Sequence, residues 1–284
     1  MIKFFVTGAD GQLGKAFQTI LPSCESVFFG KKLLNITEQK EVERAVLSWR
    51  PQFIIHCAAY TNVDDCEKHP WEAQKINHEG TKNLVLASQK ISATLVYIST
   101  DFVFDGRKNV PYSENDIPHP LSVYGKTKLA GEQEVQKLKK YLIIRTAWLF
   151  GEGKNFVRTI LELAKTQKEI PVVKDQIGSP TYALDLAQAI EKLIQRQLTN
   201  EKQSGIYHIT NSGHCSWYEF AKKIVALKQL ETKILPITTA EWQKIKPDSA
   251  PRPPYSVLAL EKIQKEGIKM RPWQEALAEY LNSL

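Results

Sequence analysis

The pattern of hydrophobic positions alternates between two periods over the first 150 residues. Short apolar runs at residues 2–7, 26–29, 53–57, 95–99 and 142–145 predict strands. Between them, apolar residues recur every three or four positions, as Leu13, Ala16, Phe17 and Ile20 do, which is typical of a helix with one buried face. Similar stretches at 42–49, 83–87 and 126–139 predict further helices. Strands that alternate with helices in this way predict an α/β fold, a doubly wound, Rossmann-like parallel sheet.

The pattern changes beyond residue 150 to helices separated by short extended pieces, with proline-containing segments at 170–180 and 246–254. Ser216 and Glu219 form a capping box ahead of one helix. Pro272 opens a last helix, whose apolar side carries Trp273, Leu277, Tyr280 and Leu284. We therefore predict one domain over residues 1–150 and a smaller α/β region over 151–284, mainly for substrate binding, that is partly interleaved with the first.

Composition excludes several classes of protein. With 43% hydrophobic and 24% charged residues, the chain is neither disordered nor a coiled coil. It has no apolar run near the roughly 20 residues that a membrane span needs, and it enters at once on a strand, so we expect a soluble, cytoplasmic protein without a membrane partner. The four cysteines are scattered, which favours a structural role for each.

The net charge of +7, from 38 basic and 31 acidic residues, raises the question of a nucleic-acid partner. The basic residues are interspersed with acidic ones, and the densest cluster, Lys137, Lys139 and Lys140, falls where a helix is predicted to end. We therefore expect no nucleic-acid partner.

Three glycines, Gly8, Gly11 and Gly14, fall between the first strand and the first helix. Glycines let the backbone turn sharply and approach a pyrophosphate, while the helix presents free N–H groups. Their spacing differs from the common G-x-G-x-x-G, and a tight turn without a ligand is the alternative. Because the turn joins a strand to a helix, we favour a dinucleotide-binding domain over residues 1–150.

Tyr124 and Lys128 lie four residues apart and so share one face of a predicted helix. A tyrosine, with an ordinary pKa of about 10, needs help to exchange protons near neutrality. An ammonium about 4 Å away supplies up to about 4 kcal/mol at an effective dielectric of about 20. The alternative is that Tyr124 and Lys128 form an ordinary pair on the helix surface without a catalytic role. Thr100 follows the fourth strand, at the edge where such sheets bind ligands, and its hydroxyl is suited to a substrate carbonyl.

Six segments together carry a specific resemblance that covers nearly the whole chain. They are CAAYTNVD at 57–64, STDFVFDG at 99–106, YGKTKLAGE at 124–132, RTAWLFG at 145–151, DQIGSPT at 175–181 and RPPYS at 252–256. Together with the glycine turn, they resemble the dTDP-4-dehydrorhamnose reductase family of the extended short-chain dehydrogenases/reductases. That family reduces the 4-keto group of a dTDP-linked 6-deoxyhexose to give dTDP-L-rhamnose, with hydride from NADPH or NADH.

The resemblance implies roles for individual residues. Tyr124 would be the general acid, Lys128 would tune it and hold the nicotinamide ribose, and Thr100 would donate a hydrogen bond to the carbonyl. The implied cofactor-binding residues are Gly8, Gly11, Gln12, Leu13, Gly14, Lys31, Asn35, Ile36, Ala58, Ala59, Tyr60, Thr61, Ile98 and Lys128. The implied substrate-binding residues are Val63, Thr100, Asp101, Phe102, Tyr124, Trp148, Arg252 and Ser256. Asn77 would bridge loops of the cofactor pocket.

The chain departs from the family pattern at two positions that affect ligand binding. Asn35 stands where an acidic residue is common, whereas Lys31 and Lys32 follow the second strand and suit a 2′-phosphate, so we favour NADPH and leave NADH open. Phe102 replaces a tyrosine, which removes one hydroxyl near the sugar. The resemblance also leaves Mg²⁺ and a homodimer open, but no carboxylate cluster with metal-ligand spacing supports a metal site.

Two alternatives remain at this stage. A nucleotide-sugar dehydratase or epimerase shares the fold, but a dehydratase commonly carries an acid where this chain has Phe102. The other alternative is a non-catalytic, NADP-binding regulatory subunit, like the one that associates with methionine adenosyltransferase. A protein can keep its cofactor-binding motifs after it has lost catalytic activity. Cofactor binding without turnover of a keto-sugar nucleotide would favour it.

Overall fold

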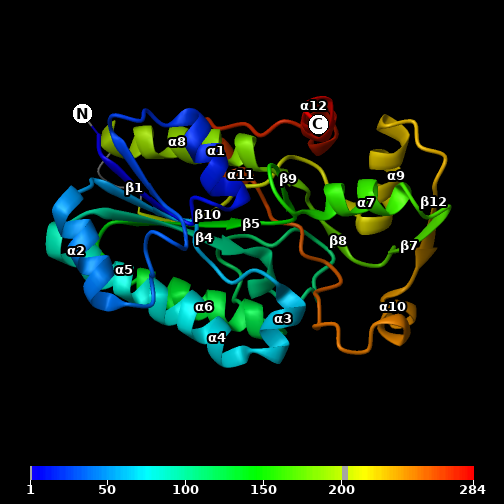
Figure 1. Ribbon diagram of the computed structural model, residues 1–284, viewed down its shortest axis with the longest axis horizontal. Coiled ribbons are helices and arrows are strands. Elements are labelled where there is room, and N and C mark those ends of the chain that lie inside the picture. The colour runs from blue at the N-terminus through cyan, green and yellow to red at the C-terminus, as the bar shows by residue number, and fades with distance from the viewer. Residues whose placement is uncertain (1, 200–203) are drawn as a thin grey trace.

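A six-stranded parallel sheet forms the centre of the protein, as seen in a computed structural model that describes residues 2–199 and 204–284 (Figure 1). From one edge to the other, its strands are β2 (Ser26–Phe29), β1 (Phe4–Thr7), β3 (Phe53–His56), β4 (Thr94–Thr100), β5 (Tyr141–Thr146) and β10 (Gly205–His208). All neighbouring strands are parallel. The chain reverses its direction of winding at β1 and β3, and such a switch point is where doubly wound sheets bind ligands.

Helices cover both faces of this sheet (Figure 1). One face carries α1 (Gln12–Ile20), α8 (Ala183–Thr199) and α11 (Glu261–Lys265), and the other carries α2 (Gln39–Trp49), α5 (Gly80–Ile91) and α6 (Val123–Val135). Because the strands are buried on both sides, they read as continuous apolar runs in the sequence. The predicted doubly wound α/β fold is confirmed.

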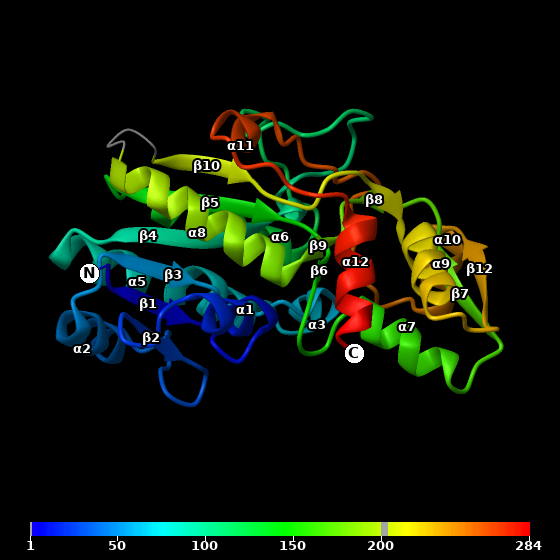
Figure 2. The ribbon, with the colours of Figure 1, turned by 90° about the horizontal axis from the view of Figure 1, so that it is seen from above.

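A second region lies beyond the carboxyl ends of the strands, at the end of the molecule away from α2 (Figure 2). Its helices are α7 (Phe156–Ala164), α9 (Trp217–Leu227), α10 (Thr239–Ile245) and α12 (Trp273–Asn282). Its short strands pair as β6 (Leu149–Phe150) with β9 (Thr181–Tyr182), β7 (Glu169–Val173) with β12 (Lys233–Ile237), and β8 (Ile177–Gly178) with β11 (Cys215–Ser216). The second region has its own hydrophobic core, separate from the cores beside the sheet, and this core includes Phe150, Phe220 and Trp273.

The two regions are interleaved along the chain. Although they follow residue 150, α8 packs against α1, and β10 extends the central sheet beside β5. The last helix follows Pro272 as expected but ends at Asn282, so Leu284 lies beyond it and is exposed. Among the residues described, no helix is both long and apolar enough to cross a membrane.

Two local features differ from the predicted helices and strands, and both position functional residues. Helix α6 spans Val123–Val135, whereas the apolar pattern pointed to 126–139. It begins at Val123 because the Ser122 hydroxyl accepts a hydrogen bond from the Gly125 N–H at 3.1 Å and caps the helix. Tyr124 therefore lies in its first turn. The chain between β3 and α5 forms α3 (Val63–Lys68), α4 (Pro70–Gln74) and a π-helical turn η1 (Lys75–Glu79), which the sequence pattern did not predict.

Candidate active site

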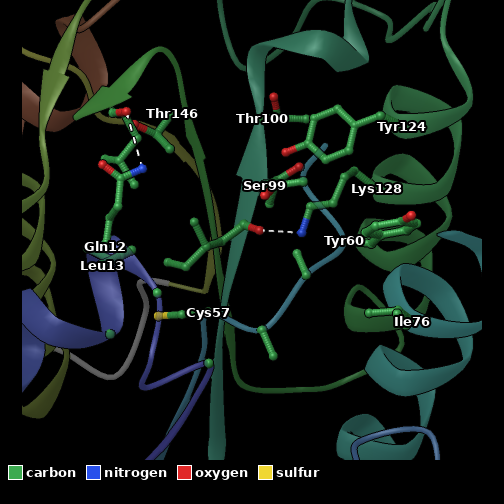
Figure 3. Close-up of a pocket in the computed structure, with 18 of the residues that line it drawn as sticks. Gln12, Leu13, Cys57, Tyr60, Ile76, Ser99, Thr100, Tyr124, Lys128 and Thr146 are labelled. Carbon is green, nitrogen blue, oxygen red and sulfur yellow. Dashed lines mark hydrogen bonds between the residues drawn. The ribbon is translucent and has the colours of Figure 1, made fainter. Parts of the chain in front are cut away.

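A cavity of about 840 Å³ opens at the carboxyl ends of the central strands, between the sheet and the second region. Figure 3 shows the part around the catalytic candidates, with Tyr124 and Lys128 on α6 facing the ends of the strands. The cavity is lined by the expected residues Gly8, Gly11, Gln12, Leu13, Gly14, Lys31, Asn35, Ile36, Ala58, Ala59, Tyr60, Thr61, Val63, Ile98, Thr100, Asp101, Phe102, Tyr124, Lys128, Trp148 and Arg252. Neither Lys32 nor Ser256 is among the lining residues.

The glycine turn forms one end of the cavity, and its close contacts explain the glycines. Gly8 has φ of +70°, and a Cβ there would lie 2.5 Å from the Ala58 backbone nitrogen. A Cβ on Gly14 would lie 2.2 Å from the Gly8 carbonyl oxygen. Gly11 is the N-cap of α1 and offers no side-chain cap, so the first N–H groups of the helix are left for another acceptor. This geometry suits an anionic group such as a pyrophosphate.

Two buried polar atoms in the cavity wall add to the fit for a dinucleotide. Gln12 Nε2 donates to the Leu149 carbonyl at 3.5 Å, but Gln12 Oε1 has no hydrogen-bond partner among the described residues. The same holds for the Thr146 hydroxyl, which lies nearby (Figure 3). Because buried polar atoms are normally hydrogen-bonded, these two are suited to a polar ligand.

Thr100, Tyr124 and Lys128 come together from β4 and α6 (Figure 3). Burial raises the pKa of the Tyr124 phenol well above its ordinary value, and a hydrogen bond with the Thr100 hydroxyl opposes that rise. The phenol is therefore protonated at neutral pH, the form that a proton donor requires.

The Lys128 side chain is almost fully enclosed. Its Nζ donates to the Ile98 carbonyl at 2.6 Å, which is the dashed line at Lys128 in Figure 3. The same atom lies 4.0 Å from the centre of the Tyr97 ring. Burial lowers the pKa of Lys128 to about 7, with Glu132 and Cys57 acting in the opposite direction. An amine with this pKa changes its charge readily near neutral pH.

Asp101 is a buried carboxyl group directly beside Thr100. It accepts hydrogen bonds from the Thr100 hydroxyl at 3.0 Å and from the Ser256 hydroxyl at 2.5 Å. Burial raises its pKa to about 6, against these two donors. Ser256 thus lies behind the cavity wall, where it supports Asp101, and Asp101 in turn orients Thr100.

Asn77, on the π-helical turn η1, joins two walls of the cavity. Its side chain accepts a hydrogen bond from the Tyr60 N–H at 2.7 Å and donates to the Tyr60 carbonyl at 3.1 Å. It also donates to the Thr127 hydroxyl on α6 at 3.1 Å. This is the bridging position that the sequence comparison implied for Asn77, and it fixes the loop after β3 against the helix that carries Tyr124.

Two aromatic contacts shape the far end of the cavity. The Trp148 ring stacks on Trp217, with ring centres 3.5 Å apart and planes 7° apart. Phe102 meets Tyr124 edge to face, with ring centres 5.7 Å apart. This contact depends on Gly125, because a Cβ there would lie 2.2 Å from the Phe102 carbonyl oxygen. The aromatic wall is suited to the apolar face of a sugar or to a base.

Arg252 reaches the cavity from the segment after α10, held by a carboxylate. Its Nη2 donates to Asp64 Oδ1 at 2.7 Å, and its Nη1 donates to the Ala250 carbonyl at 3.1 Å. Asp64 also accepts from Lys246. Burial acts to raise the pKa of Asp64, but Lys246 and Arg252 outweigh it and hold that pKa below its ordinary value. Asp64 thus anchors Arg252 beside the cavity.

Several lining residues escaped the sequence analysis, among them Asp10, Gly30, Lys154 and Trp217. Asp10 lies inside the glycine turn, so its place in the sequence was a usable signal. Trp217 begins a helix of the second region, and no local pattern connects it with the sheet. Among the described residues, no group of three or more His, Cys, Asp or Glu side chains is placed to hold a metal ion.

Comparison with known proteins decides the family. The family described as RmlD substrate binding domain matches residues 2–284. The chain belongs to this family. It is 45% identical to a spore coat polysaccharide biosynthesis protein, SpsK, of Bacillus subtilis, over 99% of this chain and 97% of that protein. It is 41% identical to dTDP-4-dehydrorhamnose reductase of Aggregatibacter actinomycetemcomitans, over 98% of this chain and 97% of that one.

A solved structure agrees with this membership of the RmlD family. The crystal structure of dTDP-4-dehydrorhamnose reductase from Bacillus anthracis in complex with NADP has a TM-score of 0.93 and 44% identity, and each chain covers 100% of the other. The resemblance inferred from the sequence motifs is therefore confirmed, and the chain groups with a family of oxidoreductases.

Proposed function

We propose that this protein reduces the 4-keto group of dTDP-4-dehydro-L-rhamnose to give dTDP-L-rhamnose, with NADPH as the hydride donor. The observation that carries the proposal is the meeting of Thr100, Tyr124 and Lys128 in one cavity that begins at the glycine turn. Relatives over 40% identical along nearly their whole length, one named as this reductase and one solved with NADP, support the substrate and the cofactor.

The reduction adds a hydride to C4 and a proton to the attached oxygen, which converts the ketone into an alcohol. Reduced nicotinamide supplies the hydride when it is bound. Tyr124 is the proton donor in this proposal, because its raised pKa keeps the phenol protonated until negative charge develops on the substrate oxygen. Thr100 donates a hydrogen bond to the same oxygen once its hydroxyl turns from Asp101.

Lys128 has a positioning role in the proposal. Its buried Nζ lies at the carboxyl end of β4, where it holds the Ile98 carbonyl and is in place to contact a nicotinamide ribose. As an ammonium, it stabilises the phenolate that remains after proton transfer, which raises the driving force for that transfer.

Two basic residues are assigned to the ends of the ligands. Arg252 would bind the diphosphate of the nucleotide sugar through its guanidinium, which Asp64 holds in place. Lys31, which is exposed at the other end of the cavity, would meet the 2′-phosphate of NADPH. NADH as a second donor, a homodimer and Mg²⁺ dependence are separate questions for the same purified protein.

The test is oxidation of NADPH, followed by absorbance, with dTDP-4-dehydro-L-rhamnose generated in the cuvette. We expect turnover by the native protein, its loss in Tyr124→Phe with NADPH binding retained, and near-native turnover in the matched control Tyr141→Phe, which lies outside the cavity. A native protein that binds NADPH but does not turn over the sugar would overturn the reductase proposal in favour of a regulatory subunit.

A further inference from the structure

The carboxyl end of β2 carries no side chain at the position where dinucleotide-binding sheets commonly carry an acid. In such sheets an Asp or Glu about 20 residues after the glycine turn binds the adenosine ribose hydroxyls. In this chain Gly30 occupies that place, directly after β2, and Lys31 follows it. Asn35, which stands nearer to α2 where an acid is common in the family, is not a carboxylate either. The residue that follows β2 therefore supplies no carboxylate to the ribose end of the cavity.

The structure supplies a carboxylate to the same space from the glycine turn. The Ala9 N–H donates to the Phe29 carbonyl at 3.1 Å, and the Lys31 N–H donates to Asp10 Oδ2 at 3.1 Å, so the turn is bonded to the end of β2. A Cβ on Gly30 would lie 2.1 Å from Asp10 Oδ2 and 2.5 Å from Asp10 Cγ. The Asp10 carboxylate thus fills the volume that a side chain at residue 30 would occupy.

The carboxylate is also available to a ligand. Asp10 is exposed and lines the cavity together with Gly30 and Lys31. Within residues 2–199 and 204–284, no basic side chain forms an ion pair with it, and its hydrogen bond from the Lys31 backbone uses one oxygen. Asp10 Oδ1 accepts no hydrogen bond from that part of the chain, so it is free to accept hydrogen bonds from hydroxyl groups.

We propose that Asp10 is the ribose-binding carboxylate of this protein, in place of a side chain at residue 30, and that it sets the balance between NADH and NADPH. A carboxylate accepts hydrogen bonds from free ribose hydroxyls but repels a 2′-phosphate. Lys31 acts in the opposite direction. Both dinucleotides therefore bind, and Asp10 favours NADH while Lys31 favours NADPH. This inference rests on the proposed function only in that a dinucleotide occupies the cavity.

The test measures equilibrium binding of NADH and NADPH by titration calorimetry, without any sugar substrate. Asp10→Asn keeps the size of the side chain and its acceptor for the Lys31 N–H but removes the charge. We expect the affinity for NADH to fall about tenfold, which is the effect of losing a charged hydrogen-bond acceptor. The affinity for NADPH should stay unchanged or rise. The matched control is Glu25→Gln, which removes one carboxylate just before the other end of β2 and leaves both affinities unchanged.

A second variant tests whether Gly30 acts through Asp10. Gly30→Ala forces a Cβ into the carboxylate, so it shifts the affinity ratio toward NADPH in the native background. In an Asp10→Ala background the space is free, and we expect Gly30→Ala to change the ratio less than twofold.

The outcomes separate this inference from the proposed function. The role of Asp10 would be overturned, with the proposed function intact, if Asp10→Asn binds both dinucleotides with an unchanged ratio of affinities. The same holds if Gly30→Ala changes that ratio equally in both backgrounds. A native protein that binds neither dinucleotide would overturn the proposed function and this inference with it.

Discussion

Replacing Glu132 with glutamine removes the carboxylate that compensates a buried guanidinium in the centre of the fold. Arg145 Nε and Nη2 donate to the two Glu132 oxygens at 2.9 and 2.7 Å, and the side chains are only 2% and 1% exposed. The Ser99 hydroxyl also donates to Glu132. Loss of one partner leaves an uncompensated buried charge, which costs about 3–5 kcal/mol.

That cost is a large share of the roughly 5–15 kcal/mol by which proteins of this kind are stable. The assay is urea unfolding of native protein and Glu132→Gln, in which the midpoint falls while the slope stays constant. The matched control is Glu162→Gln, because Glu162 pairs with Lys165 on the surface, with both side chains about two-thirds exposed. Exposed pairs contribute little, so we expect the midpoint of this control to stay near the native one.

A double variant separates the charge effect from packing. Combining Glu132→Gln with Arg145→Met removes the uncompensated charge, and we expect it to recover at least half of the loss, since apolar replacements of buried pairs are often tolerated. A loss below about 1 kcal/mol in Glu132→Gln, or a double variant as unstable as the sum of its single changes, would refute the account of Arg145 as a charge that depends on Glu132.

Three further predictions concern the cavity. Asp64→Asn frees the guanidinium of Arg252, so steady-state kinetics should show the KM for the nucleotide sugar rising about tenfold with kcat nearly unchanged; an equal fall in kcat would contradict a binding role. Burial lowers the pKa of Lys128 to about 7 in the folded state, below its unfolded value, so the native fold is penalised most below pH 7 and gains stability as pH rises above it. Lys128→Met should therefore lose this pH dependence in thermal melts, and a native-like pH dependence in the variant would refute the assignment. Gly125→Ala forces a Cβ against the Phe102 carbonyl oxygen, so we expect a loss of about 1–3 kcal/mol in urea unfolding together with reduced turnover, whereas native stability would show that α6 accommodates the methyl group.

Much of the fold was predictable from the sequence because its signals are local. The strands of the sheet that precede residue 150 are buried on both faces and so appear as apolar runs, and the capping box at Ser216 and Glu219 is present as predicted. The bounds of α6 were less well marked, because its cap at Ser122 precedes the apolar pattern and the helix ends at Val135 instead of 139. No local signal marks β10 as a strand of the central sheet, since its place depends on pairing with β5 across the intervening region.

The sequence by itself determined the glycine turn, the helical spacing of Tyr124 and Lys128, and the position of Thr100 at the end of a strand, because backbone geometry fixes these relations over a few residues. Only the tertiary structure decided which distant groups complete the cavity. Ser256 supports Asp101 from 155 residues away, Trp217 stacks on Trp148, and the Asp10 carboxylate fills the space above Gly30. These contacts depend on how separate elements pack and which volumes they leave free, and no periodicity along the chain encodes that.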